Sequence, residues 1–246
     1  MPAWAAREAT LRVFPLECDS LSTTSPLTRS LPMIAVPYIQ IKRRTLTRYD
    51  VVGLTSSKGD GRALTRGEIS ELVSKASDKV ERLYLADWDG IERNKPQLGV
   101  AQDICETLPT FYEGGVRFAN NVIDMLITGA DKCVVGSATL ASFDDIRGAF
   151  KLSENITFKV DYRDGIVGFD EGIAGRTFLS LARDVRDVGI TEMFVPDVLA
   201  SEAADAKKQL GISLGVFAPM SERSRLEQLG VDYIVAEDFG GFGDNE

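Results

Sequence analysis

The chain of 246 residues contains no histidine, and this absence excludes several kinds of chemistry at once. Without imidazole there is no Ser-His-Asp or Cys-His triad, and most zinc sites lose their usual nitrogen ligands. Proton transfer must then rely on Asp, Glu, Lys, Tyr or Cys side chains. We therefore expect no metal site, and the sequence indicates no other cofactor.

Cysteines, basic residues and long apolar runs are also scarce. The three cysteines, Cys18, Cys105 and Cys133, are unevenly spread, which favours reduced thiols of a cytoplasmic protein over a set of disulfides. The net charge of −9 argues against nucleic acid or an anionic membrane surface as the partner, because both require basic patches. No run of about 18 apolar residues is present, so we expect no transmembrane helix.

The first 32 residues differ from the rest of the chain. Residues 20–30 are rich in Ser and Thr, lack hydrophobic periodicity and do not form the apolar core of a signal peptide. Two interpretations stay open: a mis-assigned start with Met33 as the true first residue, which is slightly favoured, or a disordered N-terminal extension over residues 1–32. In both cases we expect a single domain over residues 33–246.

From Ile34 onward, short runs rich in β-branched and aromatic residues alternate with amphipathic stretches. The predicted strands are Ile34–Ile41, Arg82–Ala86, Thr110–Tyr112, Lys132–Val135, Thr157–Val160, Glu192–Val195, Ser213–Val216 and Tyr233–Ala236. The predicted helices are Glu68–Lys79, Gln97–Leu108, Ala119–Thr128, Phe143–Leu152, Arg176–Val188, Ser201–Leu210 and Ser221–Leu229. Eight strands with a helix after seven of them predict an α/β fold, a (β/α)₈ TIM barrel.

One pattern occurs twice, about one hundred residues apart: a strand, a Gly turn, a helix, a Gly-x-Asp sequence and a second strand. Its copies span residues 114–137 and 215–238. This repeat predicts a barrel made of two similar half-barrels. The strand ends of the first copy predict a phosphate site on backbone N–H groups, formed by Gly114, Gly115, Gly136 and Ser137 with Arg117 nearby. The second copy ends in Glu237 and Asp238, which would repel an anion.

Four motifs lie at the ends of successive predicted strands: Ala86–Gly90, Tyr112–Arg117, Val135–Thr139 and Val160–Gly165. They resemble the strand-end motifs of the HisA/HisF family, the sugar isomerase and the cyclase of histidine biosynthesis. The resemblance implies a barrel that holds one ligand phosphate at strands three and four, where the glycines fit. It also implies a second phosphate at strands seven and eight, where residues 215–219 and 236–238 do not fit. We expect that second site to be lost, or to hold a neutral or cationic group.

The resemblance also implies two opposed acidic residues at the ends of strands one and five. Asp161 matches the second, but the first falls on Gln40, which cannot exchange a proton near neutral pH. A family Thr after strand six falls on Pro196, just before Asp197. Carboxylates at other strand ends could supply the missing acid: Asp87, Asp89 and Asp197.

These patterns favour an enzyme that acts on a small phosphorylated metabolite through isomerase- or lyase-type acid/base chemistry at Asp161. By family resemblance alone, such divergent members are linked to cofactor or one-carbon pathways. One alternative is a retained histidine-pathway isomerase of phosphoribosylformimino-aminoimidazole carboxamide ribotide. Another is a phosphometabolite-binding barrel without catalysis.

Overall fold

The computed structural model describes residues 32–42, 45–48 and 66–237. These residues belong to one compact unit, Leu31–Glu246. Nearly all of the expected N-terminal extension lies outside the described residues, as does Asp238 of the second copy of the repeat. The division of the chain at Met33 therefore stays a prediction.

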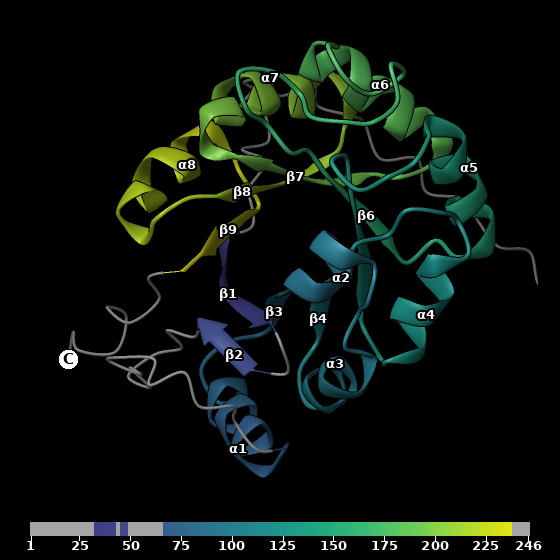
Figure 1. The fold of residues 1–246 in the computed structure, drawn as a ribbon. Helices are drawn as coiled ribbons and strands as arrows, with labels where there is room; N and C mark the ends of the chain where they lie inside the picture. Colours follow the sequence, from purple (N-terminus) through teal and green to yellow (C-terminus); the bar gives the residue numbers. More distant parts are fainter. Residues whose placement is uncertain (1–31, 43–44, 49–65, 238–246) are drawn as a thin grey trace, which may run out of the picture. The chain divides into compact units, whose positions relative to one another are not determined.

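Eight parallel strands close into a ring (Figure 1). They are β1 (Ile34–Lys42), β3 (Leu83–Asp87), β4 (Thr110–Glu113), β5 (Lys132–Gly136), β6 (Ile156–Lys159), β7 (Glu192–Pro196), β8 (Ser213–Phe217) and β9 (Tyr233–Ala236). The ring closes because β9 pairs with β1, with Ile34 opposite Tyr233 and Pro37 opposite Ala236. This closure confirms the predicted (β/α)₈ barrel. A short strand that we did not predict, β2 (Thr45–Arg48), pairs antiparallel with the end of β1.

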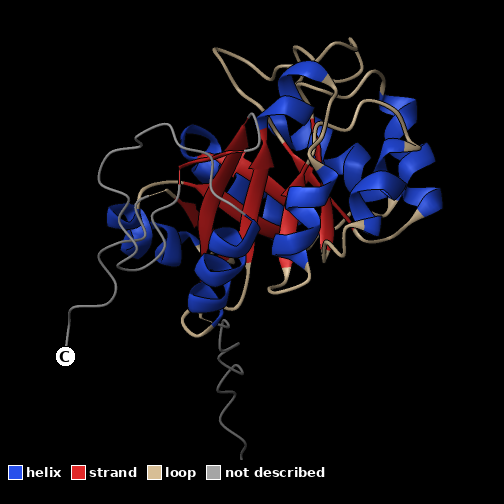
Figure 2. Cartoon of the chain, turned by 60° about the horizontal axis from the view of Figure 1, so that its bottom comes forward, coloured by secondary structure: helices blue, strands red, loops and turns tan. Residues whose placement is uncertain are grey.

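Helices surround the ring of strands (Figures 1 and 2). They are α1 (Arg66–Ser77), α2 (Trp88–Arg93), α3 (Leu98–Cys105), α4 (Asn121–Ile127), α5 (Phe143–Leu152), α6 (Phe178–Val188), α7 (Ala200–Leu210) and α8 (Arg223–Leu229). The sequence predicted seven of these and missed α2, which is six residues long and too short for a periodic signal. No helix in the described part of the chain has the length and apolar character needed to span a bilayer.

Local capping explains where several helices begin and end. The Ser142 and Thr177 side chains accept hydrogen bonds from the first turns of α5 and α6. Gly189, with φ of 118°, ends α6 in the left-handed conformation that glycine adopts without strain. In α5 the buried residues Phe143, Ile146 and Ala149 recur every three residues, so one face of the helix packs on the barrel.

Aromatic side chains fill the inside of the barrel. Alternate residues of each strand point inward, and Tyr84, Phe111 and Phe194 do so from β3, β4 and β7. The ring centroids of Phe111 and Phe194 lie 4.9 Å apart, and those of Tyr84 and Phe217 5.0 Å apart, both edge to face. This packed interior closes the floor of the barrel mouth, where the strands end and the loops begin.

Gly215 of β8 makes room for this aromatic cluster. A Cβ atom built at Gly215 would lie 2.2 Å from two ring carbons of Phe194. The Phe194 ring is fully buried among other rings and strands, so it cannot move aside freely.

We predict that Gly215→Ala destabilises the protein by about 1–3 kcal/mol, because the added methyl group overpacks the barrel interior. Urea unfolding of both forms measures the change. Gly99→Ala is the matched control: nothing lies within 4 Å of the added methyl group, and alanine favours α3. Equal stability of the two variants would contradict this account of Gly215.

Candidate active site

A cavity of about 610 Å³ opens at the carboxyl ends of the strands, where barrel enzymes place their active sites. Its walls are largely aromatic, with Tyr38, Trp88, Tyr162 and Phe217. The charged residues among the described lining are Lys159, Asp161 and Glu237. The lining comes from β1, the start of α2, and the ends of β6, β7, β8 and β9.

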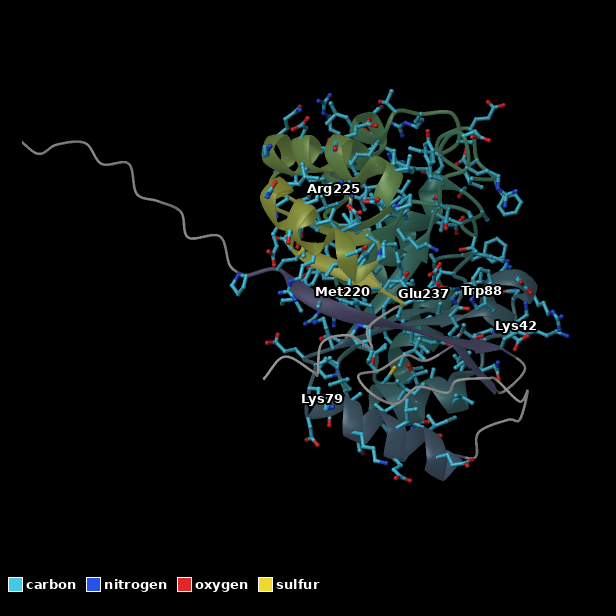
Figure 3. The ribbon with its side chains drawn as sticks, turned by 90° about the vertical axis from the view of Figure 1, so that its left-hand side faces the viewer. Lys42, Lys79, Trp88, Met220, Arg225 and Glu237 are labelled. Atoms are coloured by element: carbon cyan, nitrogen blue, oxygen red, sulfur yellow. The ribbon has the colours of Figure 1, made fainter. Side chains whose placement is uncertain are left out.

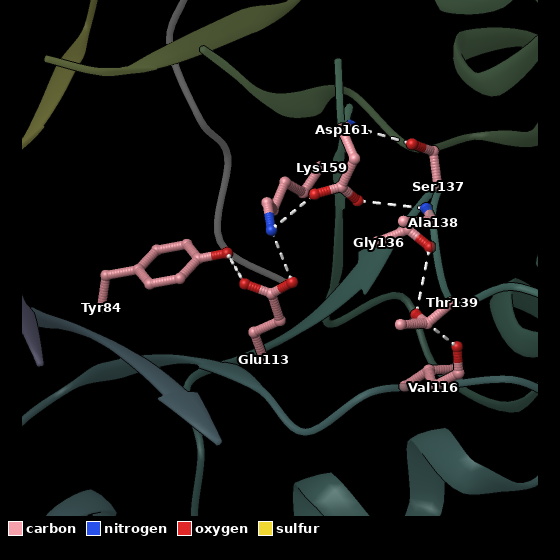
Figure 4. A network of polar contacts seen from close by, with 9 residues as sticks. All are labelled: Tyr84, Glu113, Val116, Gly136, Ser137, Ala138, Thr139, Lys159 and Asp161. Atoms are coloured by element: carbon pink, nitrogen blue, oxygen red, sulfur yellow. Dashed lines mark hydrogen bonds and ion pairs between the residues drawn. The ribbon is translucent and has the colours of Figure 1, made fainter. Parts of the chain in front are cut away.

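Lys159 lies at the centre of a polar network in this mouth (Figure 4). Its Nζ donates a hydrogen bond to Glu113 Oε1 at 2.7 Å and forms an ion pair with Asp161 Oδ1 at 2.8 Å. Lys159 is the last residue of β6, and Asp161 follows it by two residues. Because side chains alternate along an extended chain, both point into the barrel. An ammonium group has three N–H donors, and these two carboxylates account for two of them.

Glu113 is the buried anchor of the network. Its residue is only 2% exposed, and its second oxygen accepts a hydrogen bond from the Tyr84 hydroxyl at 2.8 Å. A buried carboxylate requires a cation and hydrogen bonds to offset its loss of hydration. Lys159 and Tyr84 supply both, and together they fix the position of the lysine.

The two carboxylates keep Lys159 charged. Burial by itself would lower the pKa of the ammonium group, but the nearby charges of Glu113 and Asp161 outweigh it and raise this pKa above its ordinary value. Lys159 is therefore a cation and a hydrogen-bond donor at neutral pH. It is not a free amine that could act as a base or a nucleophile.

Asp161 joins the network to the turn after β5. Its Oδ2 accepts a hydrogen bond from the Ala138 N–H at 3.1 Å, and its own N–H donates to Ser137 Oγ at 2.8 Å. The other oxygen pairs with Lys159. Asp161 thus faces the pocket, and its carboxylate accepts a hydrogen bond from the backbone of the turn at which the sequence predicts an anion site.

The glycines predicted for phosphate binding are buried. Gly114 and Gly115 follow β4, and a Cβ atom at Gly115 would lie 2.4 Å from the carbonyl of Gly90 in α2. Gly115 also has φ of +75°. Close packing against α2 explains Gly115 without a ligand, and a Cβ atom at Gly114 would lie 2.0 Å from the Met125 sulfur of α4.

After β5, Gly136 and Ser137 are buried as well, and the Ser137 N–H donates to the Lys159 carbonyl at 2.9 Å. Neither the two glycine turns nor Arg117 belongs to the lining of the 610 Å³ cavity. Phosphate binding at these turns stays a prediction.

Arg117 points to the turn of α2. Its guanidinium donates to the carbonyl oxygens of Gly90, Ile91 and Gly115 at 2.8–3.0 Å. It also lies 3.3 Å from Asn94 Oδ1. In this arrangement Arg117 ties α2 to the loop after β4.

Asp87 and Asp197 also have protein partners. Asp87 is fully buried and caps α2, and its carboxylate also accepts hydrogen bonds from the Gln97 N–H and the Tyr112 hydroxyl. Asp197 pairs with Arg225 of α8. Neither residue is part of the cavity lining, so neither stands beside Asp161 as a second acid.

Gln40, at the position of the missing acid, contacts the end of the neighbouring strand β9. Its Nε2 donates to Glu237 Oε1 at 3.3 Å. Glu237 follows β9 and lines the cavity. Two of the positions at which the chain departs from the family motifs, Gln40 and Glu237, are therefore in direct contact.

Lys159 was not predicted as a site residue, and Glu113 fell within the Tyr112–Arg117 motif without a predicted role. Both lie on the inward-facing register of their strands, Glu113 two residues after Phe111 and Lys159 two residues before Asp161. A charged residue at an inward position of a barrel strand is expensive unless it is paired. That alternation is the signal that could have identified them.

Comparisons with known proteins agree with the motifs. Residues 46–201 match the model of a family described as "Histidine biosynthesis protein". A relative from Listeria monocytogenes serotype 4a is 26% identical over 176 residues, covering 65% of this chain and 73% of the relative. One from Desulforudis audaxviator is 30% identical over 178 residues, covering 63% and 67%. One from Parasynechococcus marenigrum is 27% identical over 202 residues, covering 72% and 79%.

All three relatives are named as isomerases of an imidazole-4-carboxamide that carries two phosphoribosyl groups. A crystal structure of a lyase/mutase from Burkholderia cenocepacia J2315 is similar in fold, with a TM-score of 0.53 and 16% identity. The match covers 84% of this chain and 77% of the Burkholderia chain. Because the family match extends over more than half of the sequence, the chain belongs to the histidine biosynthesis protein family, that of the HisA/HisF barrels.

Proposed function

We propose that this barrel is an enzyme that moves a proton within a small phosphorylated metabolite, with Asp161 as the base and Lys159 as the cation beside it. The observation that carries the proposal is the 2.8 Å pair of Lys159 and Asp161 in the lining of the mouth cavity. Family membership supports a phosphorylated metabolite, since the named relatives act on a phosphoribosyl compound.

The pair suits proton abstraction next to a carbonyl or imine group. Asp161 would take a proton from the substrate, and the negative charge that develops on oxygen or nitrogen would lie next to the Lys159 ammonium. A fixed cation in a water-poor site stabilises such charge strongly. Return of the proton to another atom gives an isomerisation, and loss of a leaving group gives an elimination.

This arrangement differs from two acids opposed across the mouth. Gln40 stands where the strand-one acid is expected and cannot replace it. Glu113 accepts a hydrogen bond from Lys159 Nζ and acts as a positioning residue. We therefore propose a reaction related to, but different from, that of the named isomerases.

We predict that Asp161→Asn lowers turnover about a hundredfold to ten-thousandfold, because the base is lost while the shape of the site is kept. The substrate is first identified by mass spectrometry of a ligand that co-purifies with the protein. Turnover of that compound is then compared between the two forms, with Asp144→Asn on the exposed face of α5 as the control.

Two results would contradict the proposal. Wild-type protein that turns over the relatives' substrate as fast as they do would restore the retained-isomerase alternative. Wild-type protein that binds the identified compound but leaves it unchanged would support the binding barrel without catalysis.

We predict that Lys159→Met lowers turnover about a hundredfold to a thousandfold through loss of charge stabilisation. This variant also leaves the Glu113 carboxylate buried without its cation, which costs about 3–5 kcal/mol of stability. The double variant Lys159→Met/Glu113→Gln should therefore recover thermal stability without recovering turnover. Recovered turnover in the double variant would show that Lys159 acts only in folding.

We predict that Asp161→Ala binds inorganic phosphate about tenfold more tightly than the wild-type protein, a difference of about 1.4 kcal/mol. The reason is that the Asp161 carboxylate accepts the hydrogen bond of the Ala138 N–H group. Its negative charge would also repel an anion at the turn after β5. Isothermal titration measures both affinities, and Asp144→Ala controls for the change in net charge. A crystal soaked in phosphate should place the ion at Gly136–Ser137; an ion beside Glu237 would contradict the assignment.

A further inference from the structure

The half of the mouth cavity formed by β8 and β9 offers no cradle for an anion among the described residues. The loop after β8 runs through Phe217, Ala218 and Pro219, which line the cavity. The Ala218 N–H donates to the Val235 carbonyl at 3.1 Å, and Pro219 has no N–H group. A phosphate needs several converging N–H donors or cations, and this loop supplies neither.

The same half of the cavity carries negative charge. Glu237 extends from the end of β9, and Asp161 lies on the neighbouring wall. Lys159 is the cation among the described residues of the lining, and it already stands between the carboxylates of Glu113 and Asp161. Among the described residues, these four groups sum to a charge of −2, which favours a positively charged ligand group over a negative one.

Aromatic faces enclose the region between these charges. Tyr38 and Phe217 meet edge to face with ring centroids 5.9 Å apart. Trp88, at the start of α2, lines the same cavity as Glu237, and Figure 3 shows the two residues near each other. Aromatic walls together with carboxylates are the surroundings in which proteins hold flat rings and organic cations.

We propose that this half of the cavity binds an aromatic ring that bears an amino or ammonium group, in place of a second phosphate. The ring lies among Tyr38, Trp88 and Phe217, and the nitrogen points to Glu237. The inference rests on the proposed function for the existence of a small-molecule site, and it names the class of the substrate: an aromatic amine with at most one phosphate.

The test uses a matched pair of probes that share one ring and one phosphate. Pyridoxamine 5′-phosphate carries an ammonium group where 4-pyridoxic acid 5′-phosphate carries a carboxylate. Isothermal titration should give at least about tenfold tighter binding of the amine, and Glu237→Gln should reduce this ratio severalfold. Glu154→Gln, an equal change of charge on an exposed residue just before β6, should leave the ratio unchanged.

A third probe separates this inference from the phosphate proposal. If pyridoxamine and its phosphate bind equally, the phosphate proposal fails, but the preference for an amine can still be read from the matched pair. Equal binding of amine and carboxylate, tighter binding of the carboxylate, or no binding of pyridoxamine at millimolar concentration overturns the inference. A ratio unaffected by Glu237→Gln also overturns it.

Discussion

The arrangement of the barrel mouth depends on one interaction, the buried ion pair between Lys159 and Glu113. A carboxylate that is 2% exposed at the end of β4 is tolerable only with a cation in contact. Lys159 fulfils this need from two strands away, and it then attracts Asp161 as a second carboxylate. The hydroxyl of Tyr84 completes the set and links it to the aromatic interior. The charged mouth and the packed barrel are therefore one connected structure.

This pairing also changes what the turns at the strand ends can do. Asp161 is held between the Lys159 ammonium and the Ala138 N–H, so the protein's own carboxylate fills the place of an anion. A ligand phosphate at this turn has to displace it. The displaced carboxylate would still have Lys159 beside it, close to the reacting part of a bound molecule. In the proposed function, anion binding at this turn would therefore release the base.

The fold could be predicted from the sequence because each strand and most helices carry their own pattern. Eight apolar runs and the amphipathic stretches between them predicted the barrel. The helix α2 was missed because it spans less than two turns. The site was harder. Asp161 was found through its motif, and the structure places it in the cavity lining. Lys159 lies on the inward-facing register of β6, but it was missed because its buried partner Glu113 lies on another strand. Similarly, Arg117 next to two glycines suggested a phosphate site, whereas its guanidinium binds the carbonyls of α2.

Two departures from the family motifs are physically connected through the contact of Gln40 with Glu237. Gln40 donates a hydrogen bond to Glu237 at 3.3 Å. A carboxylate at position 40 would have to face the Glu237 carboxylate at that distance, and one of the two would then hold a proton or move away. Glutamine in place of the acid on β1 is therefore compatible with the acid Glu237 after β9, because the two side chains form a hydrogen bond. Restoring the acid alone, as in Gln40→Asp, would create a repelling pair rather than rebuild the opposed acids of the family. Both positions would have to change together, and even then Lys159 would still hold Asp161 on its own side of the mouth.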